Sequence, residues 1–153
     1  MIGENRAIPL RITLHTDYAL RVLLYLAPRP GERVATETIA TSHGVSLNHL
    51  QKVVRSLGEL GYVALHRGAG GGVELKMDPK DISVGAVVRS LDDATSLVEC
   101  FRADTNECVI ASACSLKGAL GEAQEAFYAT LDPVTLASLI RGKRGKDLRS
   151  ATG

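Results

Sequence analysis

The chain has 153 residues, a length typical of one domain, or of one small domain with an appendage. Hydrophobic residues make up 45% of it and aromatic residues only 4%, so the core is expected to be built from Leu, Val, Ile and Ala. The N-terminus lacks the apolar run of a signal peptide, and no segment approaches the roughly 18 apolar residues of a membrane span. These features exclude a membrane protein and predict a cytoplasmic one.

The net charge of +1 is unevenly distributed along the chain. Residues 1–76 carry nine Lys and Arg against six Asp and Glu, whereas residues 77–141 carry five against ten. Residues 142–153 carry four against one. A basic first half beside an acidic second half indicates a polyanionic partner for the first half, although chance scatter of a few charges gives the same asymmetry.

The first predicted helix lies within residues 15–27, and Thr16 is its expected N-cap. Apolar residues recur there at i, i+3, i+4 and i+7, which gives one buried face, and two prolines follow it. The apolar residues are Ala19, Val22, Leu23 and Leu26, and the prolines are Pro28 and Pro30.

A helix-turn-helix is predicted next. Thr36 is the expected cap of a short helix, and Gly44 suits the left-handed turn that follows it. Ser46 is the expected cap of a second helix, whose apolar face runs from Leu50 to Leu60. A short helix, a glycine-containing turn and a longer helix are typical of DNA-binding proteins.

The polar face of the second helix is the candidate recognition surface. Asn and Gln side chains can pair with adenine, and Lys and Arg can reach guanine or the phosphate backbone. A merely solvated face would also be polar, so the face alone does not decide between the two interpretations. Its outward residues are Asn48, His49, Gln51, Lys52 and Arg55.

The stretch "YVALHRGAGGGVEL" predicts a β-hairpin, with strands at 62–65 and 73–75. Its glycines permit a tight tip that approaches another surface closely, and a hairpin after a recognition helix is a wing. Arg67 at the tip suits a narrow minor groove. A nucleotide-binding phosphate loop is rejected, because such a loop requires a following helix and here a β-run follows.

Two further helices are predicted in the acidic half, the first beginning at a Ser83 cap and the second occupying about 115–132. The second has an apolar stripe flanked by alanines, which fits either a core helix or a dimerisation helix. Because a winged helix already has its own core, the stripe favours a homodimer. A further turn or two is expected near 136–140, and the polar segment 142–153 is expected to be disordered.

All three cysteines, Cys100, Cys108 and Cys114, lie in one polar loop. A disulfide framework is unexpected in the cytoplasm and leaves one thiol unpaired. The spacing lacks the paired CxxC motifs of ordinary zinc sites, and no His follows His66. Three thiolates in a loop favour an iron–sulfur cluster, which usually needs a fourth ligand, while zinc and a reactive thiol switch stay open as alternatives.

The combination of these motifs resembles the Rrf-type winged-helix transcriptional repressors, and among them the nitric-oxide-sensing iron–sulfur repressors. The resemblance runs from about residue 10 to residue 140. It rests on "ITLHTDYALRVLLYLA", "GVSLNHLQKVV", "RGAGGG", "CVIASACSLKGAL" and "AFYATLDPVTLASLI".

The resemblance implies that the three cysteines bind a cluster, generally [4Fe-4S], with [2Fe-2S] as the alternative. It also implies that Asp17, in the "HTDYAL" motif, is a fourth ligand donated across the dimer. Without the resemblance, Asp17 would be interpreted as a helix cap or a helix-dipole partner. The seven-residue gap between the first two cysteines equals that of related iron-responsive regulators. Asp17 and "NHLQK" favour the nitric-oxide-sensing branch.

The expected protein is mainly α with a small β-hairpin, and its parts are a winged helix-turn-helix at 10–78, a cluster loop with dimerisation helices at 79–141 and a disordered tail at 142–153. It is expected to be a homodimeric repressor, not an enzyme, that binds palindromic double-stranded DNA and responds to nitric oxide. The alternative signal is iron or iron–sulfur status. A redox enzyme is disfavoured because no His lies near a cysteine in the sequence. The predicted DNA-binding residues are Ser46, Asn48, His49, Gln51, Lys52, Arg55, Arg67 and Gly68.

Overall fold

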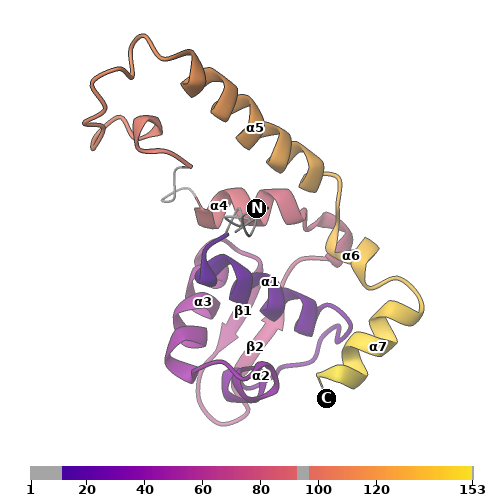
Figure 1. Ribbon diagram of the computed structural model, residues 1–153. Coiled ribbons are helices and arrows are strands. Elements are labelled where there is room, and N and C mark those ends of the chain that lie inside the picture. Colours follow the sequence, from indigo (N-terminus) through magenta and orange to yellow (C-terminus); the bar gives the residue numbers. More distant parts are fainter. Residues whose placement is uncertain (1–11, 93–96, 153) are drawn as a thin grey trace, which may run out of the picture.

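Helices dominate the computed structural model, which describes residues 12–92 and 97–152 (Figure 1). The elements in chain order are α1 (Leu14–Leu26), α2 (Thr36–His43), α3 (Leu47–Glu59), β1 (Val63–His66), β2 (Gly72–Leu75), α4 (Val84–Asp92), α5 (Ser115–Leu131), α6 (Leu136–Leu139) and α7 (Lys143–Ala151). Single 3-10 turns occupy Pro79–Asp81 and Glu99–Phe101. No helix in the described part of the chain has the length and apolar character to cross a membrane.

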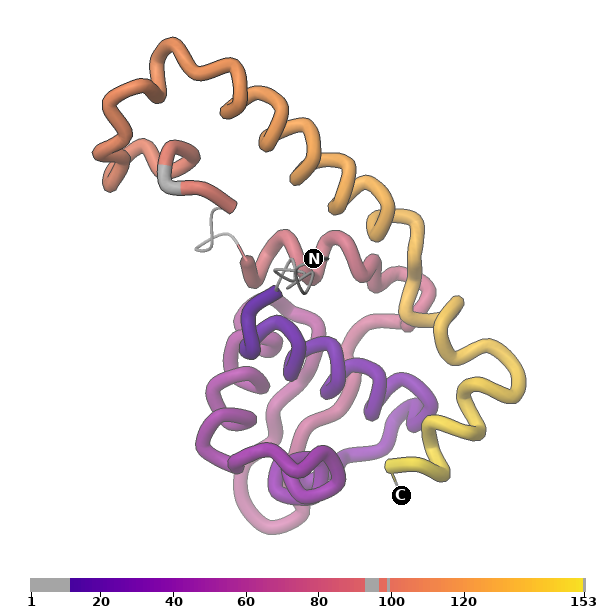
Figure 2. The backbone as a smooth tube through the Cα atoms, in the orientation of Figure 1, coloured from indigo at the N-terminus to yellow at the C-terminus, as the bar shows by residue number. Residues whose placement is uncertain are grey.

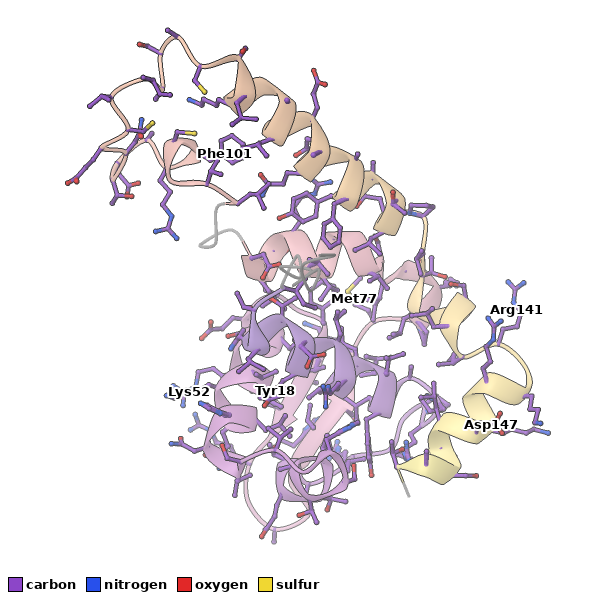
Figure 3. The ribbon with its side chains drawn as sticks, in the orientation of Figure 1. Tyr18, Lys52, Met77, Phe101, Arg141 and Asp147 are labelled. Atoms are coloured by element: carbon purple, nitrogen blue, oxygen red, sulfur yellow. The ribbon has the colours of Figure 1, made fainter. Side chains whose placement is uncertain are left out.

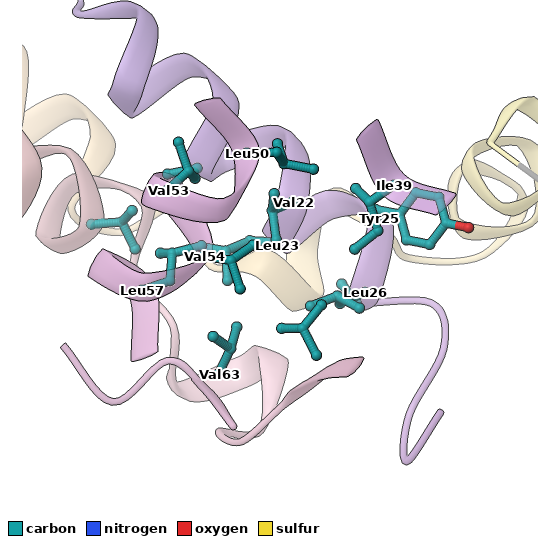
Figure 4. Close-up of a cluster of buried hydrophobic side chains, with 14 of the residues drawn as sticks. Val22, Leu23, Tyr25, Leu26, Ile39, Leu50, Val53, Val54, Leu57 and Val63 are labelled. Carbon is teal, nitrogen blue, oxygen red and sulfur yellow. The ribbon is translucent and has the colours of Figure 1, made fainter. Parts of the chain in front are cut away.

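The first three helices and the hairpin enclose one aliphatic core (Figure 4). The predicted inward face of α1 is confirmed, since its four apolar residues are completely buried. They meet the apolar face of α3, where Leu50, Val53 and Leu57 are at most 1% exposed. Removing this aliphatic surface from water stabilises the fold by about 25 cal/mol per Å² of apolar area.

The hairpin is a two-stranded antiparallel sheet, in which Val63 pairs with Leu75 and His66 with Gly72. A third segment extends it, because Val34 and Val73 exchange two backbone hydrogen bonds of 3.0 and 2.8 Å. The predicted wing is therefore present, with β1 beginning one residue later than expected. It is anchored to the segment that precedes α2.

Two predicted helix caps are wrong. Helix α1 begins at Leu14 with Thr13 as its N-cap, and Thr16 lies buried inside the first turn. Ala35, which has no side-chain acceptor, occupies the cap position of α2, so Thr36 is already helical. The predicted caps Ser46 and Ser83 do accept backbone hydrogen bonds, and Gly44 adopts the left-handed conformation at the end of α2.

Helix α4 joins the winged helix to α5, which extends away from the rest of the molecule (Figures 1 and 2). The two helices approach closely at Gly85, where a Cβ would lie 2.6 Å from the backbone nitrogen of Asp132. Arg89 reinforces the junction by bonding Glu125 and Asp132, and its guanidinium lies 4.3 Å from the ring centre of Tyr128. The base of α5 is therefore fixed to α4.

The segment 142–153 differs from the predicted disordered tail, because residues 143–151 form α7. The buried Arg29 donates to the backbone oxygen of Arg149 and to Thr152, and Arg149 donates to the backbone oxygen of Pro28. Arg149 also pairs with Glu32. These contacts over more than a hundred positions hold α7 against the end of α1, which composition alone did not predict.

Candidate nucleic-acid interface and metal centre

The recognition surface is formed by the outward face of α3. Ser46 accepts the backbone N–H of His49 at 3.3 Å and so fixes the first turn of the helix. All the predicted contact residues on α3 are exposed, and Lys52 lies on the opposite side of the molecule from Arg141 and Asp147 (Figure 3). The face is thus accessible and is held on a rigid, well-packed helix.

The wing places a second set of predicted residues near α3. Arg67 and Gly68 are exposed in the turn between β1 and β2, and Gly71 closes the turn by donating to the backbone oxygen of Gly68 at 2.9 Å. Gly68 and Gly70 have φ angles of 83° and 73°, which side chains rarely adopt. The tip thus has a defined shape that depends on glycine.

A polar network behind the wing was missed by the sequence interpretation. His66 Nε2 lies 2.9 Å from Glu74 Oε1, and Arg33 Nε lies 3.4 Å from the other carboxylate oxygen of Glu74. The hydrogen bond with His66 is the main reason that the pKa of Glu74 lies below its ordinary value, and the charge of Arg33 adds to it. The alternation of side chains along paired strands could have predicted that Glu74 lies near His66. The ion pair between Arg33 and Glu74 could not be predicted in this way, because Arg33 lies outside both strands.

Helix α1 contributes further side chains beside the recognition helix. His15 Nε2 lies 3.1 Å from Ser56 Oγ, and the rings of Tyr18 and His49 are 6.4 Å apart. Arg21 lies over the Tyr18 ring, with 5.6 Å to its centre. These contacts fix how α1 sits on α3, so any displacement of α1 reaches the predicted DNA-binding face.

The segment 97–114, which carries all three cysteines, precedes α5 and lies at the end of that helix remote from α6 (Figure 3). All are free thiols and half-buried. Cys100 is the middle residue of the 3-10 turn Glu99–Phe101. The backbone N–H of Cys108 donates to Asn106 Oδ1 at 3.0 Å. Cys114 is the N-cap of α5. The three soft donors therefore belong to one continuous segment of the chain.

The soft donor set suits iron–sulfur chemistry, because clusters are held by cysteine thiolates. Cys114 also sits where helix N–H groups favour negative charge. Within residues 12–92 and 97–152, however, no three His, Cys, Asp or Glu side chains are close enough to hold one metal ion. The donors have the right chemistry, but this conformation does not bring them around a common centre.

Asp17, the predicted fourth ligand, lies in the first turn of α1 and pairs with Arg21. Arg21 donates to both carboxylate oxygens, at 2.7 and 3.3 Å. Asp17 is not grouped with any cysteine in the described chain. Its carboxylate is partly exposed, with 33% of the side-chain surface accessible, so it is open to a partner other than Arg21.

Comparisons with known proteins agree with this architecture. The family model Rrf2, described as an iron-dependent transcriptional regulator, matches residues 12–142. The transcriptional regulator NsrR of Bacillus subtilis is 50% identical over 135 residues, covering 88% of this chain and 92% of that protein. The transcriptional repressor NsrR of Streptomyces coelicolor is 41% identical over 145 residues, covering 94% and 97%.

A solved structure supports the same conclusion. The structure of T. potens IscR superposes with a TM-score of 0.69 at 25% identity, covering 95% of this chain and 93% of that one. The family match over residues 12–142 includes the winged helix and helices α4, α5 and α6. The chain is therefore a DNA-binding transcriptional regulator of the Rrf2 family.

Proposed function

We propose that this regulator is a homodimeric repressor that senses nitric oxide through an iron–sulfur cluster held by Cys100, Cys108 and Cys114. The observation that carries the proposal is the presence of three free thiols in one loop of a chain that also contains a winged helix. The similarity to proteins named NsrR, one of them a repressor, supports both the cluster and the signal.

The DNA contacts are assigned to α3 and the wing. Two recognition helices of a dimer would lie in successive major grooves of a palindromic operator, about one helical turn apart. The side chains of Asn48, His49, Gln51, Lys52 and Arg55 would face base edges and phosphates, and Ser46 would present the helix N-terminus to the backbone. Arg67 and Gly68 would approach the adjacent minor groove.

The dimer is assigned to α5. Leu116 on α5 is 61% exposed and Ile110 in the preceding loop is 60% exposed, which leaves apolar surface uncovered in a single chain. The stripe that includes Leu120 and Ala123 continues along the same helix. A second copy packing on this stripe would cover it in a symmetric interface.

The metal centre is assigned to the three thiolates, with Asp17 of the second copy as the fourth ligand. A [4Fe-4S] cluster would supply iron that reacts with a small diatomic molecule, and a [2Fe-2S] cluster is the alternative. Ligation by all three thiolates would hold the loop in one conformation. Release of the thiolates would free the loop and the link between subunits, so the recognition helices would lose their operator spacing.

A second candidate signal is the supply of iron or of iron–sulfur clusters. It is supported by the description of the matching family as iron-dependent and by the seven residues between Cys100 and Cys108. The DNA-binding and dimer assignments are the same under both signals. The signals differ in what removes operator binding, which is iron depletion in one case and nitric oxide in the other.

The test begins with purification without oxygen. The wild type is expected to be brown and to contain iron and sulfide, whereas Cys100→Ala, Cys108→Ala and Cys114→Ala should each lose both. Ser112→Ala, in the same loop, is the matched control and should keep them. Normal iron and sulfide in all three cysteine variants would refute the cluster assignment, and a colourless zinc protein would favour a different metal.

The signal is tested with the loaded wild type on operator DNA. Addition of a nitric oxide donor is expected to weaken binding at constant iron supply, while exposure to a mild iron chelator should act more slowly. If the chelator abolishes binding and nitric oxide leaves it unchanged, the iron-responsive candidate replaces the nitric oxide sensor.

A further inference from the structure

Asp92 is a buried acidic residue that neither the DNA-binding face nor the cysteine loop explains. Asp92 is the last residue of α4 and is only 7% exposed. The first cysteine follows eight positions later in the sequence. Asp92 therefore occupies the point where the winged-helix part of the chain leads into the cysteine loop.

The partners of Asp92 are the hydroxyl groups that begin α1. Its Oδ1 accepts Thr16 Oγ1 at 2.6 Å and Thr13 Oγ1 at 3.3 Å. Thr16 is completely buried, and Thr13 is the N-cap that accepts the backbone N–H of Thr16 at 3.1 Å. One carboxylate oxygen thus bonds the cap of a helix more than seventy positions away in the sequence.

The first turns of α1 connect this cap to the recognition helix. His15 bonds Ser56 of α3 and Tyr18 contacts His49, so α1 cannot rotate or slide without disturbing α3. Asp17, the proposed fourth ligand, lies in the same turn as Thr16. The turn bonded by Asp92 therefore carries both a proposed ligand and the contacts to the DNA-binding face.

On its other side, α4 is fixed to α5. Val87 and Val88 of α4 are at most 1% exposed. Arg89 forms ion pairs with Glu125 in α5 and with Asp132, the residue that follows α5. Helix α4 thus packs between the base of α5 and the start of α1. A change in the position of its last turn is transmitted through packed side chains and directional hydrogen bonds.

Packing alone does not account for an acidic residue at this position. Burial of carboxyl oxygens costs free energy unless they are hydrogen-bonded, and a well-packed apolar side chain often stabilises as much. The carboxylate differs from an apolar side chain in that its hydrogen bonds are directional. Its bonds to two hydroxyl groups fix the position of the end of α4 relative to the start of α1.

We propose that Asp92 is a positioning residue that transmits the state of the cysteine loop to the DNA-binding face, by holding the end of α4 in register with the cap of α1. The inference rests on the proposed function. With the thiolates ligated, the loop and the end of α4 are fixed, and Asp92 holds α1 against α3. With the thiolates released, the end of α4 moves and displaces the α1 cap with it.

The test uses the full chain with Thr16→Val, which keeps the shape of the side chain and removes the hydroxyl. Thr16→Ser is the conservative variant that keeps the hydroxyl. Thr130→Val is the matched control, because the Thr130 hydroxyl bonds only the backbone oxygen of Ala126 in its own helix. The quantity measured is the ratio of operator affinities between the cluster-loaded and cluster-free protein, together with iron content and thermal unfolding.

Thr16→Val is expected to load iron normally but to reduce this ratio by about tenfold, the scale of one lost hydrogen bond to a charged group. Thr16→Ser and Thr130→Val should keep the wild-type ratio. Asp92→Asn, which keeps an acceptor oxygen in place, should fall between them. This gives a second route if Thr16→Val folds poorly.

A wild-type ratio in folded, iron-loaded Thr16→Val and Asp92→Asn would overturn the proposal and leave the proposed function intact. A wild type that binds no iron, or whose operator affinity does not depend on it, would refute the proposed function itself and this inference with it. Equal losses in Thr130→Val would show a general effect of the substitution and would also count against Asp92.

Discussion

Asp17 and Arg21 form an exposed ion pair on the first turns of α1, with 2.7 Å between the closest oxygen and nitrogen. Exposed pairs with this i,i+4 spacing contribute about 0.3–0.5 kcal/mol. Asp17→Ala is therefore expected to lower the free energy of unfolding of the cluster-free protein by no more than that amount. Urea unfolding measures it.

The same substitution should have a larger effect on the loaded protein if Asp17 is a ligand. Solvent can take one coordination position, so iron should still bind but should be lost faster on exposure to oxygen. Arg21→Ala breaks the same ion pair without removing the carboxylate and serves as control. Equal rates of iron loss in wild type and Asp17→Ala would return Asp17 to the role of a helix-dipole partner.

His66 and Glu74 predict an acid sensitivity of the wing. The pKa of Glu74 is lowered in the folded protein, mainly by the hydrogen bond with His66. The stabilisation from the ionised Glu74 is therefore fully present above the ordinary glutamate pKa of 4.5 and is lost as pH falls through the lowered pKa of the folded protein. The melting temperature of cluster-free Glu74→Gln should be lower than that of the wild type at pH 6, and the difference should shrink toward pH 3. A difference that is constant with pH would contradict this.

Helix α3 and the wing are expected to make different kinds of DNA contact. Lys52→Ala should weaken binding to all sequences and lower the salt dependence by about one unit, as expected for a lost phosphate contact. Arg67→Ala should reduce the preference for A·T-rich flanks, where the minor groove is narrow. Asn48→Ala and His49→Ala should each cost about 1–3 kcal/mol and reduce the sequence preference inside each half-site.

Operator variants measured at two salt concentrations distinguish these outcomes. All four substitutions should leave the iron content unchanged, because none of these residues is a proposed ligand. Unchanged affinity, salt slope and sequence preference in all four would place the DNA on another surface.

Helix α7 is expected to contribute to the stability of the winged helix. Arg29 is 5% exposed, and three of its hydrogen bonds go to Tyr25, Arg149 and Thr152. Arg29→Ala should lower the free energy of unfolding by about 2 kcal/mol or more, since bonds from a buried charged group are lost. Arg149→Ala should cost less, because its side chain is 49% exposed. No change in urea unfolding on removal of residues 143–153 would show that α7 contributes nothing.

The sequence predicted the elements whose signals are local. The apolar spacing in α1 and α3, the Ser46 cap and the glycine-rich wing each depend on residues a few positions apart. All are present in the structure except at Leu60, which follows the last residue of α3 and is 42% exposed. Helix α7 was missed because it is held by a distant residue, Arg29, over 120 to 123 positions. The cap of α1 was misassigned because Thr13 and Thr16 are threonines three positions apart, and the buried Thr16 hydroxyl donates to Asp92, 76 positions away. The roles of the cysteines and of Asp17 came from the family resemblance and stay predictions.

The dimer is tested on the apolar stripe of α5. Leu120→Glu places a charge at the centre of the proposed interface and should give a monomer, because burying an unpaired carboxylate is costly. Glu122→Gln, on the same helix but off the stripe, should remain a dimer. Analytical ultracentrifugation measures both. A dimer for Leu120→Glu that is as tight as the wild type would move the interface elsewhere.

The monomeric variant also tests whether operator binding and iron retention depend on the dimer. Operator binding should fall with loss of the dimer even in protein that keeps iron, because two half-sites need two recognition helices. If Asp17 is donated by the second copy, iron in the Leu120→Glu monomer should also be lost faster on exposure to oxygen.

The contact between α7 and the end of α1 joins the first and the last helix of the described residues. During translation, Arg29 emerges more than a hundred residues before Arg149 and Thr152, its later partners. Since domains generally fold as their chains leave the ribosome, the DNA-binding unit of this protein begins to fold early but gains this support only after more than a hundred further residues have been made. While α4, the cysteine loop and α5 are being synthesised, the end of α1 therefore lacks its contacts with α7.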